Sequence, residues 1–191
     1  MTDRPSCPSC GKKGVAIAIS VAAEINIAGS LAVGMSPART RRDWQQRWNE
    51  LEQEGDQLNA PHTEIMSGVA INSAHHRLQS FFIQAYHLKD ALIADPSNGL
   101  AKNVVEDAIS NRPTLSLLAD LANLDKHSQL DRARSGSVPT ILSVNGQQPG
   151  SGNGWLLCVS ISHNGRVLDG IDTVNEVLNE WRAQLKSWNL I

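Results

Sequence analysis

The sequence has almost no net charge, few cysteines and no long uninterrupted hydrophobic run. Its 191 residues carry 17 basic and 19 acidic side chains, a formal net charge of −2, so no overall field would attract nucleic acid or an anionic membrane. Three cysteines cannot build a disulfide framework, which favours a reducing cytoplasm. Residues 14–34 are rich in Ala, Val and Ile, but Glu24 and Asn26 interrupt them, and a spanning helix needs about 20 apolar residues. We therefore expect a cytoplasmic protein without a membrane span.

Several common functional motifs are also missing. The sequence contains no G-x-S-x-G nucleophile elbow, no Walker A loop, no G-x-G-x-x-G dinucleotide loop and no RNP-like motif. Its hydrophobic content of 41% and charged content of 19% are ordinary for a folded domain. A function must therefore be sought in polar side chains that a folded core brings together.

Near the N-terminus, Cys7 and Cys10 form a C-x-x-C knuckle. Such a turn can aim two thiolates at one zinc ion, but a closed structural site needs four ligands. No second C-x-x-C follows in the sequence. His62, Cys158 or a second copy of the chain could complete the site, or the knuckle is unoccupied. Zinc is thus the one cofactor that the sequence suggests.

Apolar residues at helical spacing predict five helices. Ser36-Pro37 suits the start of the first helix, Asp95-Pro96 the end of the second, and Asp172 or Thr173 the cap of the last. The expected helices cover about residues 36–54, 62–95, 100–109, 113–127 and 172–188. Their apolar positions, which we expect to be buried, include Trp44, Trp48, Leu51, Ile65, Val69, Leu78, Phe82, Ala85, Val174, Val177, Leu178, Trp181 and Leu185.

Strands are expected at both ends of the chain. Alternating apolar residues within 15–33 predict a β-hairpin. Residues 140–144 and 155–162 predict two more strands, and Asn164-Gly165 predicts a tight turn into a third at 166–168. We expect the N-terminal hairpin and the C-terminal strands to form one small antiparallel sheet.

These elements predict an α+β fold, mainly a helical bundle with a small antiparallel sheet. We divide the chain into three parts. Residues 1–35 carry the cysteine knuckle and hairpin, residues 36–135 form the helical bundle, and residues 136–191 add a β-hairpin and a C-terminal helix that packs on the bundle.

Two of the predicted helices each carry polar residues on one face. His87 and Asp90 are three residues apart, and Asp120, Asn123 and His127 follow at spacings of three and four, so each set shares a helix face. If the two faces meet, two imidazoles, two carboxylates and an amide converge. This is the main candidate site in the sequence.

Three roles for this convergence are open. Two imidazoles and two carboxylates on facing helices can hold a divalent ion, although no H-E-x-x-H or E-x-x-H motif is present. Alternatively, His87 and His127 could move protons near neutral pH, as RNA cleavage requires, with Lys126 on the phosphate. In the third role, His–Asp pairs are hydrogen bonds that fix the register of two helices.

The H-L-K-D motif at 87–90, the D-L-A-N-x-x-K-H motif at 120–127 and a closing strand–helix with Trp181 resemble a family of bacterial helical proteins. Residues 65–132 are also similar to the HEPN superfamily, which includes ribonucleases of toxin–antitoxin and phage-defence systems. The HEPN signature is an Arg, four to six residues, then a His.

In this chain Asp120 occupies the place of the signature Arg, and six residues separate it from His127. The resemblance implies a HEPN-like module, a homodimer in a prokaryotic defence or toxin–antitoxin context, with RNA or a protein as partner. Because the Arg that contacts RNA phosphate is replaced, a non-catalytic module is the first expectation. The alternatives are a metal-independent ribonuclease using His127 and His87, and a metal-binding protein using these two histidines with Asp90 and Asp120.

Overall fold

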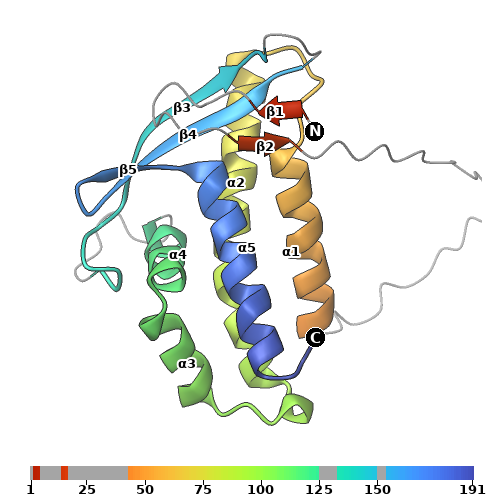
Figure 1. The fold of residues 1–191 in the computed structure, drawn as a ribbon, viewed down its shortest axis with the longest axis vertical. Helices are drawn as coiled ribbons and strands as arrows, with labels where there is room; N and C mark the ends of the chain where they lie inside the picture. The colour runs from red at the N-terminus through yellow and green to blue at the C-terminus, as the bar shows by residue number, and fades with distance from the viewer. Residues whose placement is uncertain (1, 5–13, 17–42, 125–132, 150–153) are drawn as a thin grey trace, which may run out of the picture.

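The helices of this chain lie side by side, with a small sheet toward one end (Figure 1). The computed structural model describes residues 2–4, 14–16, 43–124, 133–149 and 154–191. The expected α+β class with mainly helical content is confirmed. The helices are α1 (Trp44–Asn59), α2 (Gly68–Ala94), α3 (Lys102–Asn111), α4 (Pro113–Leu124) and α5 (Gly170–Ser187), with a 3₁₀ turn η1 (Pro96–Asn98).

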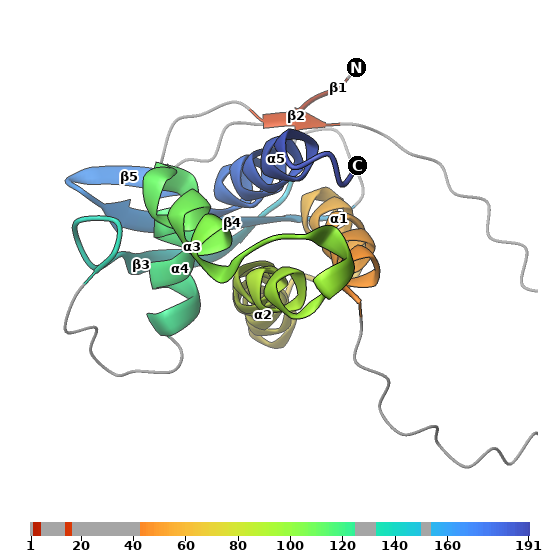
Figure 2. The same ribbon diagram turned by 90° about the horizontal axis from the view of Figure 1, so that it is seen from below.

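One hydrophobic core unites these helices with the sheet. Seen along the helices, α1, α2, α5 and the α3–α4 pair surround a common centre (Figure 2), and α2 contacts all four of the others. The apolar stripes of α1 and α5 are buried as expected, including Trp48 and Trp181. Because both stripes repeat at helical spacing, burial of apolar area accounts for the helical conformation of these segments.

The ends of α1 differ from the sequence-based expectation. The predicted start at Ser36 is wrong, because the helix begins at Trp44 and Asp43 caps it by accepting a hydrogen bond from the Gln46 N–H at 2.7 Å. The helix also continues through Gly55, where we expected a loop. At Gly55 an added Cβ would overlap the side chain of Leu178, so the missing side chain lets α1 approach α5 closely.

The start of α2 is also later than predicted. The helix begins at Gly68, with Ser67 as its cap, instead of at His62. His62 has an extended backbone and exchanges two hydrogen bonds with Trp155, at 2.7 and 2.9 Å. The expectation that Ile65 and Val69 are buried is wrong, since they are 89% and 81% exposed.

Other helix ends are set by proline and by side-chain caps. α2 ends at Ala94, before Pro96, and α4 begins at Pro113, both as predicted. The cap of α5 is Asp169 rather than Asp172 or Thr173. Its Oδ1 accepts hydrogen bonds from the N–H groups of residues 171 and 172 at 2.8 and 3.1 Å.

The C-terminal strands β3 (Thr140–Gln147), β4 (Leu156–His163) and β5 (Arg166–Asp169) form an antiparallel sheet in the order β3-β4-β5. Asn164 and Gly165 have φ values of 50° and 70°, which is the tight hairpin turn that their sequence predicts. These strands are confirmed, and β3 runs three residues further than expected, to Gln147.

The expectation of a single sheet is wrong for the described residues. β1 (Thr2–Arg4) and β2 (Gly14–Ala16) pair with each other as a separate two-stranded sheet. The remainder of the hairpin predicted within 15–33 lies outside the described residues. Over the part of the chain that the structure describes, no helix has the length and apolar character needed to cross a membrane.

Candidate functional site

His87 and Asp90, the first half of the candidate site, lie one helical turn apart on α2. The His87 Nδ1 is 2.7 Å from the Asp90 Oδ2, and the two side chains are 35% and 53% exposed. A carboxylate at this distance orients the imidazole and leaves its Nε2 on the far side of the ring. The pair lies at the surface, and its ring could exchange protons with a bound molecule.

Next to this pair, Lys89 joins α2 to α3. Its Nζ lies 2.6 Å from Glu106 Oε1 and 4.7 Å from the centre of the Tyr86 ring. The other oxygen of Glu106 is 3.2 Å from Arg134 Nη1. Glu106 therefore pairs with two cations, one on α2 and one on the turn that precedes β3.

The pKa values of these groups shift in the direction expected for an ion pair. Although burial alone would lower the pKa of Lys89, the hydrogen bond to Glu106 and the neighbouring Tyr86 raise it overall. Burial alone would raise the pKa of Glu106, but Lys89 and Arg134 lower it overall. Lys89 and Glu106 are therefore both charged at neutral pH, and the Glu106 carboxylate already pairs with the two cations that could bind a phosphate.

Asp120, on α4, is buried, with 2% of the residue exposed. Its Oδ1 accepts a hydrogen bond from the Arg134 N–H at 2.8 Å. Its Oδ2 accepts two from Ser135, at 2.7 Å from the N–H and 2.5 Å from the hydroxyl. Three donors compensate the burial of this carboxylate, which holds the 133–137 turn against α4.

His163, at the end of β4, extends this cluster to the sheet. Its Nε2 lies 2.8 Å from Ser135 Oγ. Because the Ser135 hydroxyl donates to Asp120, its remaining role toward His163 is that of acceptor, so Nε2 carries the proton. A serine protease triad has imidazole between serine and carboxylate, whereas here serine lies between the other two. His163 therefore cannot act as a base on Ser135 in this arrangement.

The described residues that we expected to converge thus belong to two separate groups of contacts. His87 contacts Asp90, Asp120 contacts Ser135, and Glu106 links the two groups through Lys89 and Arg134. Asn123 lies near the end of α4 and is partly exposed. Lys126, His127, Cys7 and Cys10 lie outside the described residues. Within the described ranges, no group of three or more His, Cys, Asp or Glu side chains could hold a metal ion.

The two residues that we considered as further zinc ligands both lie near the start of β4. His62 stacks on Trp155, with ring centres 4.4 Å apart, and burial followed by the charge of Arg77 lowers its pKa. Cys158 is buried in β4, with its Sγ 3.5 Å from Gln147 Oε1. Zinc at the cysteine knuckle stays a prediction.

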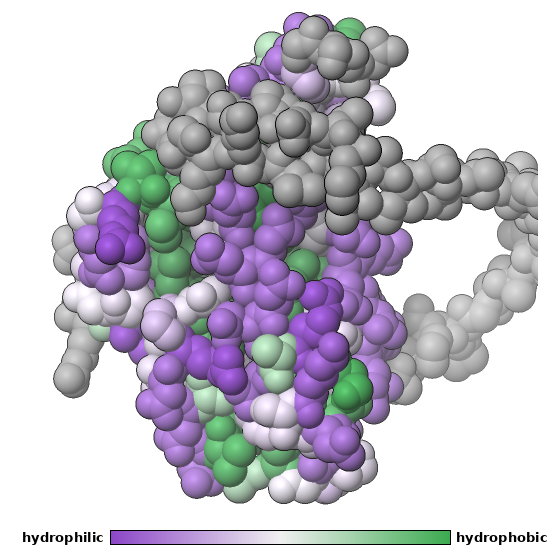
Figure 3. All heavy atoms as spheres, viewed as in Figure 1, coloured by the Kyte–Doolittle hydropathy of each residue, from purple (hydrophilic) through white to green (hydrophobic). Residues whose placement is uncertain are grey.

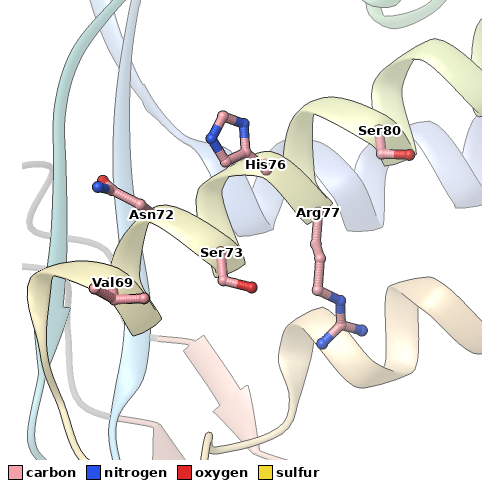
Figure 4. Close-up of a pocket in the computed structure, with 6 residues that line it drawn as sticks. All are labelled: Val69, Asn72, Ser73, His76, Arg77 and Ser80. Carbon is pink, nitrogen blue, oxygen red and sulfur yellow. The ribbon is translucent and has the colours of Figure 1, made fainter.

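An open depression of about 530 Å³ lies beside the first half of α2. Val69, Asn72, Ser73, His76, Arg77 and Ser80 line it. Figure 4 shows that these side chains point in different directions around the helix, with Arg77 extended toward α1. Arg77 pairs there with Glu54 at 3.0 Å. Because the polar groups diverge and the cation is already paired, this depression is a weaker candidate than the surface around His87.

Sequence reasoning missed Glu106, Arg134, Ser135 and His163. No spacing rule connects them to Asp120, because the contacts join α4, a turn and the tip of a β-hairpin. The nearest signal was Asp120 itself, a carboxylate on the apolar side of a helix, which requires buried donors.

Comparisons with protein-family models, with curated proteins and with solved structures find no significant match to this chain in any of the three.

Proposed function

We propose that this chain is a non-catalytic, HEPN-like helical module of the cytoplasm. In this proposal it forms a homodimer and binds a protein or RNA partner in a prokaryotic defence or toxin–antitoxin system. The observation that carries the proposal is the state of Asp120, which occupies the position of the signature Arg. It is buried and accepts three hydrogen bonds from the 133–137 turn, so it serves the fold.

The charges nearby support the same function. An RNA-cleaving site needs a cation to stabilise the charge that develops on the phosphate. Lys89 and Arg134 both lie near the candidate face, but each forms an ion pair with Glu106. A module that binds a protein partner has no need of an unpaired cation at this place.

A metal-independent ribonuclease is the second candidate, and one observation favours it. His87 is partly exposed and held by Asp90 at 2.7 Å, which is the usual arrangement of a histidine that transfers protons. Its proposed partners His127 and Lys126 lie outside the described residues. A metal-dependent site using His87, Asp90, Asp120 and His127 is the third candidate, and the separation of Asp120 from His87 disfavours it.

A cleavage assay distinguishes these candidates. Purified wild-type chain, His87→Ala and His127→Ala are incubated with labelled single-stranded RNA, with and without EDTA. His76→Ala is the matched control, because His76 is an exposed histidine on the same helix. We expect all four proteins to give the same background.

Cleavage by wild type that persists in EDTA, is lost in both His87→Ala and His127→Ala, and is retained in His76→Ala would overturn the non-catalytic proposal in favour of the ribonuclease. Cleavage that EDTA abolishes would favour the metal site instead. Sedimentation velocity of the wild-type protein tests the homodimer, and zinc analysis of wild type and Cys7→Ser tests the knuckle.

A further inference from the structure

The connection between α1 and α2, residues 60–67, has few contacts with the rest of the protein. His62 is partly buried, and the other residues of the connection are exposed. Three hydrogen bonds tie the connection to Trp155. His62 and Trp155 exchange two through their backbones, at 2.7 and 2.9 Å, and the Trp155 indole N–H donates the third to the Glu64 carbonyl oxygen at 2.9 Å. A segment with so few buried contacts opens at a lower free energy than the core.

The side chain of His62 also covers Trp155. The two rings stack with their centres 4.4 Å apart, and Trp155 is only 2% exposed. Gly154, with a φ of 103°, approaches so closely that an added Cβ would overlap the His62 carbonyl oxygen. The connection therefore covers the indole, and its closed position depends on His62 and on the lack of a side chain at Gly154.

A protonated His62 does not suit this position. Its Nε2 is buried and has no hydrogen-bond partner among the described residues. In the imidazolium both ring nitrogens carry a proton, so Nε2 would become a buried donor without an acceptor. Arg77, on α2, opposes the added charge, Glu64, on the connection itself, favours it, and Trp155, the contact from the sheet, is uncharged. Burial and Arg77 outweigh Glu64, so the pKa of His62 lies below its ordinary value.

We infer that residues 60–67 are a pH-sensitive latch on Trp155, which opens locally when His62 takes up a proton while the helices and the sheet stay folded. Opening moves the imidazolium into water, away from Arg77. Because one proton is taken up on opening, the equilibrium constant for opening rises by up to about tenfold for each pH unit between the ordinary and the lowered pKa of His62. This inference does not depend on the proposed function.

Opening of the latch would increase the apolar surface of the protein. Ile65 and Met66 in the latch, and Val69 just after it, are already 89%, 46% and 81% exposed. On the face shown in Figure 3, hydrophilic side chains cover most of the helices, and hydrophobic atoms lie on the side of the sheet. Release of Trp155 would add its indole to the exposed apolar area, so mild acid would change the surface of the protein without unfolding it.

Amide hydrogen exchange of the full chain at pH values from 7.5 to 5.5 tests the latch. The amides of His62 and Trp155 donate the two backbone hydrogen bonds and therefore report its opening, whereas the amides of Val159 in β4 and Val177 in α5, both fully buried, report the core. After correction for the intrinsic effect of pH on exchange, we expect the protection of the two latch amides to fall at least fivefold over this range. At every pH they should be at least tenfold less protected than the core amides.

Low concentrations of urea separate local opening from global unfolding. Local opening exposes little surface, so exchange of the latch amides should not change with urea, whereas exchange through global unfolding accelerates steeply. Latch amides that are as well protected as those of the core, or equally dependent on urea, would mean that the connection opens only when the whole protein unfolds. That result overturns the inference.

Matched histidine variants test which group controls the latch. His62→Gln should remove the pH dependence of latch protection, whatever level of protection remains. His75→Gln is the matched control and should retain the pH dependence, because His75 also has a buried, unpartnered Nε2 and a pKa lowered by burial but lies on α2. Loss of the pH dependence in His75→Gln, or its persistence in His62→Gln, overturns the assignment to His62.

Gly154→Ala tests the closed position without changing a titratable group. The added Cβ should hold the latch open, so the amides of His62 and Trp155 should lose their protection already at pH 7.5. Circular dichroism should show an unchanged helix content. Full protection of both amides in Gly154→Ala would contradict the close contact from which the latch is inferred.

Discussion

Ser135 donates two hydrogen bonds to the same carboxylate oxygen of Asp120, one from its backbone N–H at 2.7 Å and one from its hydroxyl at 2.5 Å. Fourteen residues separate them in the sequence. The contact fixes the turn before β3 on the end of α4, and His163 joins it to the β4–β5 hairpin. Asp120 thus connects the helical bundle to the sheet.

Removing this carboxylate should destabilise the protein. In Asp120→Ala, three donors lose their acceptor at a buried site, and we expect the free energy of unfolding to fall by about 2–4 kcal/mol. Urea denaturation measures the change. Asp107→Ala, at an exposed position of α3, is the control and should change it by less than about 0.5 kcal/mol. Equal stabilities of the two variants would contradict a structural role for Asp120.

Ser135 and His163 should be energetically coupled. Their hydrogen bond at 2.8 Å exists only when both side chains are present, so Ser135→Ala and His163→Ala should not have additive effects. From unfolding of the two single variants and the double variant, we expect a coupling energy of about 0.5–1.5 kcal/mol. Additive effects would mean that the hydrogen bond contributes nothing measurable.

Glycine substitutions should report how closely α5 approaches the sheet. At Gly170 an added Cβ would lie 2.8 Å from Val159 Cβ and 3.3 Å from Leu78 Cδ2, so Gly170→Ala should destabilise the protein by about 1–3 kcal/mol. At Gly68 an added Cβ meets no atom within 4 Å. Gly68→Ala, the matched control at the start of α2, should stabilise by about 0.4–1 kcal/mol. Thermal melts that shift in the same direction would contradict this packing.

Stability should decrease in mildly acidic solution because of His62. Burial, and then the charge of Arg77, lower the pKa of His62 below its ordinary value of 6.5. As the pH falls below about 6.5, the unfolded chain takes up a proton that the folded chain resists, so the free energy of unfolding falls until the pH passes the lowered pKa. Above about pH 6.5 the imidazole of His62 is neutral in both the folded and the unfolded chain, so His62 no longer lowers the free energy of unfolding.

Urea denaturation at pH 7 and pH 5 measures this loss. His62→Gln should lose less stability over this interval than the wild type. Burial also lowers the pKa of His75, so His62→Gln/His75→Gln should be flatter still. Equal losses in all three proteins would show that these histidines do not cause the pH dependence.

Much of the local structure can be predicted from the sequence. Periodic burial of Trp48 and Trp181, the helix break at Pro113 and the turn at Asn164-Gly165 depend on spacing and on backbone preferences. These are properties of neighbouring residues.

The choice between competing local signals needed the tertiary structure. The sequence suggested Ser36 as the cap of the first helix, and the helix begins after Asp43. Ile65 and Val69 continue a helical apolar pattern, yet the chain at His62 pairs with Trp155 and leaves them exposed. At His62 the deciding hydrogen bonds come from Trp155, which is far away in the sequence.

The contacts of the candidate site also have both local and long-range causes. The sequence by itself determined that His87 and Asp90 share a helix face, because an α-helix places residues three apart on one side. Only the tertiary structure decided that Asp120 contacts Ser135, which in turn contacts His163, and that Glu106 pairs with Lys89 and Arg134. A buried carboxylate requires hydrogen-bond donors. The sequence does not show which residues supply them, because the donors come from segments that only the folded chain brings next to α4.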